Sequence, residues 1–509
     1  MRNFQKAEYL RHSAPRQARA AAPLLLMAAL LMPGPAALAR ELADRAEPTQ
    51  EGTVNGEADV DTPPDGGDAG HLADLEVRMR DLEAELAAVA RRQKTDPDAL
   101  LELERRLEIL SREIEKLQIG KAAVMADQPV HGLGPAASKI YQAGEGVSIG
   151  GYGEMLYEGF DSRKDDESPS GKTDKLDFLR AIIYLGYKFN DRILFNSEIE
   201  FEHASTGKDG EVSVEFAYLD FLFKDQINAR AGLLLIPMGF INELHEPPIF
   251  LGARRPDLER RLIPSTWREN GAGVFGDLGP VSYRAYMVAG FDGAGIDESG
   301  FSASGLRGGR QSGSKSLAED FAFVARADWE ITPGLTLGGS FYTGDSGQGA
   351  VAPTTGEKID ARTEIMDVHL EWRWRGLEFR ALYVTVDVDD ADRLNEFQDD
   401  RDDPLTPRPL TDSIGSEMDG YYVQAGYDVF SFRETHQALI PYVRYEEFDT
   451  QSEVPSGFLR DPANDVEVIT YGIAYKPIPN VVFKLDFQDF DNAAGTGTDQ
   501  WNLAAGFLF

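Results

Sequence analysis

The chain from residue 146 to Phe509 alternates apolar and polar side chains with a period of two. In the last segment Trp501, Leu503, Ala505 and Phe507 share one face, while smaller or polar residues mostly occupy the other. Successive side chains of a β-strand point to opposite sides, so the pattern predicts strands with one apolar and one polar face. We count sixteen such segments, which begin near residues 146, 175, 192, 211, 226, 270, 281, 318, 334, 362, 376, 417, 436, 464, 479 and 497.

The links between these segments alternate between short and long. Asn190-Asp191 and Gly279-Pro280 are short turns, whereas the links at 237–269 and 389–416 are long. An even number of strands with short turns at one end and long loops at the other is typical of bacterial outer-membrane barrels. We therefore predict an all-β fold in which residues 146–509 form a 16-stranded antiparallel transmembrane β-barrel.

A soluble β-sandwich is the alternative, because alternation alone does not say which face meets water. Aromatic residues gather on the apolar face at strand ends, as at Trp372 and Trp374. Such aromatic belts are typical of the two membrane interfaces of a barrel. Together with an export signal, they favour the barrel.

The first 39 residues resemble a secretory signal peptide. Basic residues precede an apolar run from Ala20 to Ala39, which ends in Ala37-Leu38-Ala39. This arrangement predicts export and cleavage after Ala39. Prolines interrupt the run, so it falls short of the roughly 20 apolar residues that a membrane anchor needs.

A heptad repeat follows an acidic flexible linker at 40–71 and covers residues 72–118. Its first apolar position holds Leu72, Met79, Leu86, Leu100, Leu107 and Ile114, and its second holds Leu75, Leu82, Val89, Leu103, Leu110 and Leu117. The repeat predicts an α-helical coiled coil with a break at 95–97, where Pro97 interrupts the helix. A helix packed on another domain is the alternative. Residues 119–145 are expected to form a second linker.

Composition excludes several classes of function. The chain has no cysteine, which removes disulfides, zinc–thiolate sites and cysteine nucleophiles. Its formal net charge of −35 argues against nucleic acid as a partner. No catalytic triad or paired-carboxylate site stands out, so we expect neither an enzyme nor a cofactor nor a metal centre.

Two further sequence patterns resemble binding motifs but lack the context that such motifs need. Residues 271–276 match G-x-G-x-x-G, but a tight turn follows where a dinucleotide site needs a helix. The acidic runs at 387–392 and 399–403 lack EF-hand spacing and are expected to be solvated. Bridging of divalent ions to lipopolysaccharide is the alternative for these runs.

Three short motifs lie in the predicted barrel: Gly151-Tyr152-Gly153, Leu235 to Phe240, and Arg254-Arg255-Pro256 with Trp267 to Gly273. With the heptads, the sixteen strands and the terminal Phe509, they resemble the phosphate-selective porin O and P family. The resemblance implies a trimeric outer-membrane porin whose third loop enters the channel, with an anion path lined by arginine and lysine. The family's phosphate-site lysines match no single positions here.

Charged residues on the polar strand faces are candidates to line the channel. The basic candidates are Arg180, Arg230, Arg284, Arg326, Arg373, Arg380, Arg444 and Lys484. The acidic candidates are Glu198, Glu200, Glu202, Asp220, Asp328, Glu330, Asp367, Glu371, Glu446 and Asp486. Rings of one sign select ions of the other, so this mixed lining is unlike that of a strongly anion-selective pore.

The segment 237–269 is the predicted constriction loop, because loops of this length usually have a function. Its anion-binding candidates are Arg254, Arg255, Arg260, Arg261 and Arg268. Arginine suits phosphate and carboxylate groups, whose geometry its planar fork matches. The loop also carries Glu243, Glu246, Asp257, Glu259 and Glu269. In the alternative interpretation the arginines pair with these acids and with the barrel wall, and only hold the loop in place.

These observations predict a bacterial outer-membrane porin for passive diffusion of small hydrophilic solutes, with a phosphate-type preference for anions. A general or cation-favouring porin, whose periplasmic coiled coil mainly tethers the outer membrane to the cell wall, is the alternative. The expected partners are outer-membrane lipid and lipopolysaccharide, two further copies in a homotrimer, the cell wall, and small ions such as phosphate.

Overall fold

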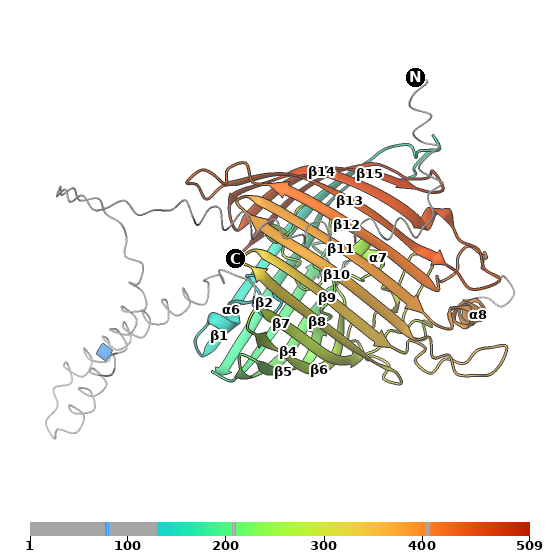
Figure 1. Cartoon of the computed structure of the whole chain (residues 1–509), viewed down its shortest axis with the longest axis horizontal. Coiled ribbons are helices and arrows are strands. Elements are labelled where there is room, and N and C mark those ends of the chain that lie inside the picture. The colour runs from blue at the N-terminus through green and yellow to red at the C-terminus, as the bar shows by residue number, and fades with distance from the viewer. Residues whose placement is uncertain (1–76, 79, 81–129, 206, 208–209, 403–407) are drawn as a thin grey trace, which may run out of the picture. The chain divides into compact units, whose positions relative to one another are not determined.

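Sixteen strands form one closed antiparallel barrel in the computed structural model of the chain (Figure 1). The structure describes residues 77–78, 80, 130–205, 207, 210–402 and 408–509. The predicted signal peptide, the acidic linker and the coiled coil lie outside the described residues, apart from Val77, Arg78 and Arg80, which are helical. The predicted 16-stranded barrel is confirmed.

Every strand begins within three residues of its predicted start. The strands are β1 (Gly146–Phe160), β2 (Lys175–Asn190), β3 (Ile193–Glu202), β4 (Val212–Lys224), β5 (Ile227–Leu235), β6 (Arg268–Leu278), β7 (Val281–Ala289), β8 (Phe321–Thr332), β9 (Leu335–Gly344), β10 (Thr363–Trp374), β11 (Leu377–Val388), β12 (Glu417–Tyr427), β13 (Ala438–Glu453), β14 (Asp465–Ile478), β15 (Val481–Asn492) and β16 (Gln500–Leu508).

Each strand pairs with its neighbours in sequence, and β1 closes the barrel by pairing with β16. At this seam Gly151 and Phe509 exchange two backbone hydrogen bonds of 3.0 and 2.9 Å. Closure leaves no strand edge unpaired, which is what a sheet in contact with hydrocarbon requires.

The outward face is apolar and the inward face is polar. On β15 the side chain of Leu485 is 48% exposed, while its neighbours Lys484 and Asp486 are 2% and 1% exposed. On β16 the outward Trp501 and Leu503 are likewise about half exposed, at 53% and 51%. A water-soluble sheet would have the opposite arrangement, because burying apolar surface drives its folding.

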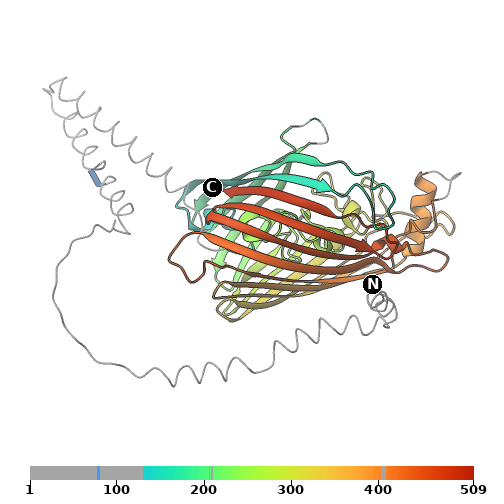
Figure 2. The same cartoon turned by 90° about the horizontal axis from the view of Figure 1, so that it is seen from above.

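The described helices from residue 130 onward are short and lie outside the strands. They are α6 (Lys139–Gln142), which precedes β1; η2 (Pro247–Ile249) and α7 (Leu258–Arg261), between β5 and β6; η3 (Arg307–Gly309), between β7 and β8; α8 (Ala391–Asp402), between β11 and β12; and η4 (Pro462–Asn464), between β13 and β14. In Figure 2 the loop between β5 and β6 is seen within the wall of strands. Among the described residues, none of the helices is long and apolar enough to cross a membrane.

Candidate functional site

The loop at 236–267 lies in the interior of the barrel and contacts opposite parts of its wall. The backbone N–H of Leu258 donates to Glu446 on β13 at 3.1 Å, and that of Ala253 donates to Asp486 on β15 at 2.6 Å. His245 lies 3.1 Å from Glu198 on β3. Apolar side chains of the loop, including the fully buried Trp267, join inward residues of the strands in one buried cluster. The loop is therefore held from several sides.

The turn at Gly239 is held by charged side chains of the wall. Its φ of 62° favours glycine, and a Cβ there would lie 2.5 Å from Oε2 of Glu259. Its N–H donates to Asp367 on β10 at 3.2 Å, and its carbonyl accepts a hydrogen bond from Arg326 on β8. Both polar groups of this peptide segment are thus satisfied by charged side chains of the wall.

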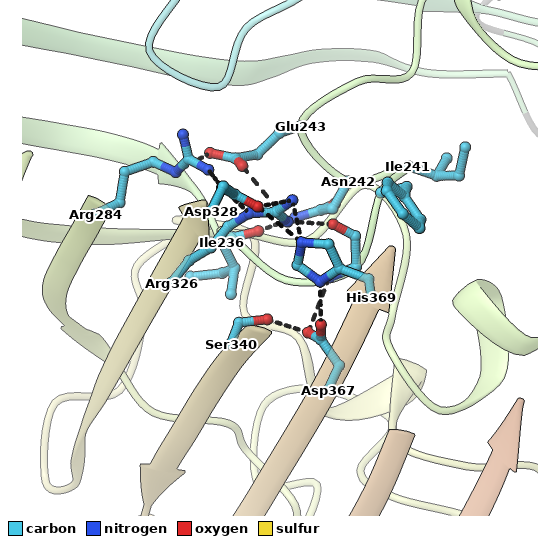
Figure 3. A network of polar contacts seen from close by, with 12 residues as sticks. Ile236, Ile241, Asn242, Glu243, Arg284, Arg326, Asp328, Ser340, Asp367 and His369 are labelled. Atoms are coloured by element: carbon cyan, nitrogen blue, oxygen red, sulfur yellow. Dashed lines mark hydrogen bonds and ion pairs between the residues drawn. The ribbon is translucent and has the colours of Figure 1, made fainter. Parts of the chain in front are cut away.

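These wall residues belong to a larger network around His369 (Figure 3). Nδ1 of His369 lies 2.7 Å from Asp367 and Nε2 lies 2.8 Å from Asp328. Asp328 also accepts hydrogen bonds from Arg284 and Arg326, at 2.7 and 2.8 Å. The network therefore balances three basic side chains with buried carboxylates around the loop.

Ser340 completes the network without forming a hydrolytic triad. Its hydroxyl donates to Asp367, whereas a triad serine contacts the imidazole nitrogen that takes its proton. In His369 both ring nitrogens face carboxylates instead. This arrangement supports positioning of the loop and offers no activated nucleophile.

Two of the five predicted loop arginines are tied to the barrel wall. Arg254 lies 2.7 Å from Glu158 on β1, and Arg268 lies 2.8 Å from Glu215 on β4. The ion pair of Arg254 holds the loop against the wall, as the alternative interpretation expected. Arg268 was predicted in the loop but is the first residue of β6, so its ion pair joins two strands of the wall.

The side chains of the other three loop arginines have fewer polar partners. Arg260 lies 3.4 Å from Asp257 and its side chain is 44% exposed. Within the described part of the chain, Nη2 of Arg255 and Nε of Arg261 are buried without a hydrogen-bond partner. Unpaired guanidinium nitrogens can accept an anion without first breaking an ion pair.

Two arginines that the sequence analysis missed come from the loop between β7 and β8. Arg307 and Arg310 each donate to the backbone oxygen of Ser265 at 2.7 Å. They lie in a Gly- and Ser-rich link with no alternating pattern, so no periodic signal marked them. Their contact with the 236–267 loop is a tertiary feature that spacing does not reveal.

We use the name arginine cluster for Arg254, Arg255, Arg260, Arg261, Arg307 and Arg310. Burial, followed by the charges of Arg310, Arg260 and Arg255, lowers the pKa of Arg307 to about 9. Burial and then Arg260 and Arg254 lower the pKa of Arg261. Although burial opposes it, Arg254, Arg260 and Arg261 hold the pKa of Asp257 below its usual range. Cations crowd around one carboxylate here, which favours binding of an additional anion.

The acids of the loop do not neutralise this cluster, apart from Asp257. Glu243 faces Arg284 at 3.3 Å, and Glu259 accepts hydrogen bonds from the backbone N–H groups of Phe240 and Ile241. Glu246 accepts from Ala136 and Ala137, and Glu269 accepts from Gln311. Among the acids of the loop, Asp257 is therefore the one whose charge acts mainly on the cluster, and the wall adds Glu158 and Glu202.

The strand candidates lie on the inward register, as the alternation predicted, and most are buried there. The buried basic residues are Arg180, Arg230, Arg284, Arg326, Arg380, Arg444 and Lys484, and the buried acids include Glu198, Glu200, Asp220, Asp367, Glu446 and Asp486. Arg373 and Glu330 lie near the strand ends and are exposed, and Glu202, Asp328 and Glu371 are partly buried. The loop and residues 130–143 cover most of these side chains.

Acidic residues could also hold a metal ion. The described residues include no group of three or more His, Asp or Glu side chains arranged as metal ligands.

Comparison with known proteins places the chain in a family. No family model matches it. An uncharacterized protein of Aquifex aeolicus (strain VF5) is 37% identical over 399 residues, which cover 77% of this chain and 87% of that protein. The chain belongs to the family of this Aquifex protein. Because no family model matches, the resemblance to the phosphate-selective porin O and P family stays a prediction.

The chain is also similar to solved structures of outer-membrane proteins. OmpF of Salmonella typhi in complex with daunomycin has a TM-score of 0.47 at 12% identity, and covers 72% of this chain and 98% of its own. The anion-selective porin of Comamonas acidovorans has a TM-score of 0.44 at 10% identity, covering 71% and 99%. The outer-membrane channel DcaP of Acinetobacter baumannii has a TM-score of 0.44 at 14% identity, covering 71% and 97%.

Proposed function

We propose that this protein is an outer-membrane channel through which small hydrophilic solutes diffuse passively. A closed barrel whose outward face is apolar and whose inward face is charged suits a lipid surround and an aqueous interior. Outer-membrane lipid and lipopolysaccharide are its proposed surroundings. Self-association as a homotrimer and contact of the coiled coil with the cell wall complete the proposal.

The channel prefers anions of the phosphate type, and the arginine cluster is the observation that carries this proposal. Six arginines converge from two loops on a region that contains Asp257 and is bordered by the wall acids Glu158 and Glu202. Arg255 and Arg261 retain unpaired guanidinium nitrogens, and Arg260 is open to solvent. The planar guanidinium group holds its N–H donors in a fixed fork, which matches the oxygen atoms of an oxyanion.

The test is the reversal potential across a planar bilayer under a gradient of potassium chloride. The variant Arg255→Gln/Arg260→Gln/Arg261→Gln is expected to lose the anion preference of the wild type. Inorganic phosphate, added to one side, is expected to reduce chloride current in the wild type and not in this variant.

The matched control is Arg192→Gln/Arg375→Gln/Arg433→Gln, which removes the same charge at exposed positions near the short turns. It is expected to keep the wild-type reversal potential. Cation preference in the wild type, or equal shifts in both triple variants, would refute the anion filter. The second candidate, a general or cation-favouring channel, would then stand on the inward acids Glu198, Glu200, Glu202 and Asp220.

A further inference from the structure

Residues 130–143, which precede the first strand, lie inside the barrel and are not part of its wall. Leu133, Ala136, Ala137 and Ile140 are each at most 3% exposed. We call residues 130–143 the pre-barrel segment. The segment was predicted to be part of a linker at 119–145, yet linkers usually run over the surface, where water satisfies their backbone polar groups.

Hydrogen bonds to the loop and to the wall hold the middle and the end of the pre-barrel segment. The N–H groups of Ala136 and Ala137 donate to one carboxylate oxygen of Glu246 at 3.0 and 3.1 Å. The carbonyl of Ala137 accepts from Asn196 on β3 at 3.0 Å. The hydroxyl of Tyr141 donates to Asp220 on β4 at 2.6 Å and accepts from Arg230 on β5 at 2.7 Å.

The start of the segment reaches further around the same wall. The ring of His131 lies 4.8 Å from that of Phe275 on β6 and 4.9 Å from that of Tyr141. A cavity of about 270 Å³ remains beside Val130 and His131, lined also by Tyr283 and Arg284. The segment thus crosses the inner wall from β2 to β7, and the cavity leaves room at one side of it.

We propose that the pre-barrel segment is a stopper, which closes the barrel at the end where β1 begins and opens it on withdrawal. Seated, it covers Asn196, Asp220, Arg230 and Glu246, which would otherwise face the interior. Its contacts are apolar packing, ring contacts and side-chain hydrogen bonds, without ladder pairing to any strand. Such a segment can leave as a unit while the sixteen paired strands stay intact. This inference rests on the proposed channel function.

An engineered disulfide tests directly whether the pre-barrel segment lies against the wall, because the chain has no cysteine of its own that could form a competing bond. A Cβ built on Gly186 of β2 would lie 3.1 Å from Cβ of Ile140. Disulfides place these atoms about 3.5–4.5 Å apart, so a small shift suffices. The full-length variant Ile140→Cys/Gly186→Cys is expected to form the bond under oxidation and thereby lock the stopper.

Conductance in planar bilayers tests the consequence. The oxidised variant is expected to conduct several-fold less than the same protein after reduction. The release variant Tyr141→Phe/Asn196→Ala, which changes no charge, is expected to conduct more than the wild type. The single variants Ile140→Cys and Gly186→Cys are the controls, and oxidant should leave their conductance unchanged.

The outcomes separate this inference from the channel proposal. Failure of the disulfide to form would contradict the position of the pre-barrel segment beside β2. Equal conductance of the oxidised and reduced forms would refute the stopper but leave the channel proposal intact. Absence of conductance in every form, the reduced and release variants included, would refute the channel and the stopper together.

Discussion

Glu246 is a buried side chain whose protonation couples the interior of the barrel to pH. Burial raises its pKa to about 7, although the N–H groups of Ala137 and Ala136 oppose this shift. Glu198 on β3, the adjacent His245, Lys139 of the pre-barrel segment and Tyr184 on β2 also face it. Withdrawal of the pre-barrel segment would return Glu246 to water and to its ordinary pKa.

The proton therefore binds more tightly in the seated state. The equilibrium constant for seating the segment is highest below about pH 4.5. It falls by up to about tenfold per pH unit as the pH rises to about 7. We expect mean conductance in planar bilayers to rise over this interval and to level off above it. The variant Glu246→Gln, which stays neutral, should have a flat profile; the same slope in this variant would contradict the assignment.

The strands are the elements whose alternation has the most direct energetic meaning. Leu485 lies on the outward face in the middle of β15, and Ile478 lies outward at the turn that precedes this strand. Leu485→Arg is expected to lower the free energy of unfolding by about 2–4 kcal/mol, because arginine is costly at the bilayer midplane.

Urea unfolding in lipid vesicles measures this loss. Ile478→Arg is the matched substitution, and near the interface it should cost only about 0–1 kcal/mol. Equal costs at both positions would mean that the outward face does not contact hydrocarbon.

Alternation also explains why the strands could be predicted from sequence. A period of two is a local property, and each of the sixteen segments carries it without reference to the others. The short turns add local signals of their own, such as Gly279 with a φ of 66°. The barrel followed from these signals, and so did the inward register of residues such as Arg326 and Lys484.

The contents of the barrel could not be predicted in the same way. Whether Arg254 meets Glu158 or an anion depends on how a loop folds against a strand ninety-six positions away. Arg307 and Arg310 reach the loop from a separate link, and the burial of Ala136 and Ala137 requires the assembled wall. Partner choice among charged residues is tertiary, and spacing carries no information about it.

Over the whole molecule, a group of positive side chains lies in the interior while many carboxylates lie on the outward register. Its net charge is −35, yet the arginine cluster gives the interior a local positive region. Many carboxylates lie on the outward register of β10 to β14 instead, including Glu364, Asp387, Glu417 and Glu467. Net charge therefore does not decide the preference of the channel, because the wall keeps these acids apart from the interior.

Ionic strength provides a measure of this local field. Raising salt from 0.1 M to 1 M shortens the screening length from about 10 Å to about 3 Å. The anion-to-cation permeability ratio, obtained from reversal potentials at both concentrations, is expected to fall toward one. A ratio that does not change with salt would contradict an electrostatic origin in the arginine cluster.

The seam between β1 and β16 imposes an order on biogenesis. Its two strands are the first and the last of the barrel, so no ribosome-bound or C-terminally truncated chain can complete the ring. The 236–267 loop is enclosed by that ring and contacts β3, β13 and β15, so it reaches its final contacts only as these strands come together. The pre-barrel segment can enter later, because the proposed stopper moves while the strands stay paired. Closure of the seam therefore completes the wall and its enclosed loop together, and the stopper can be seated afterwards.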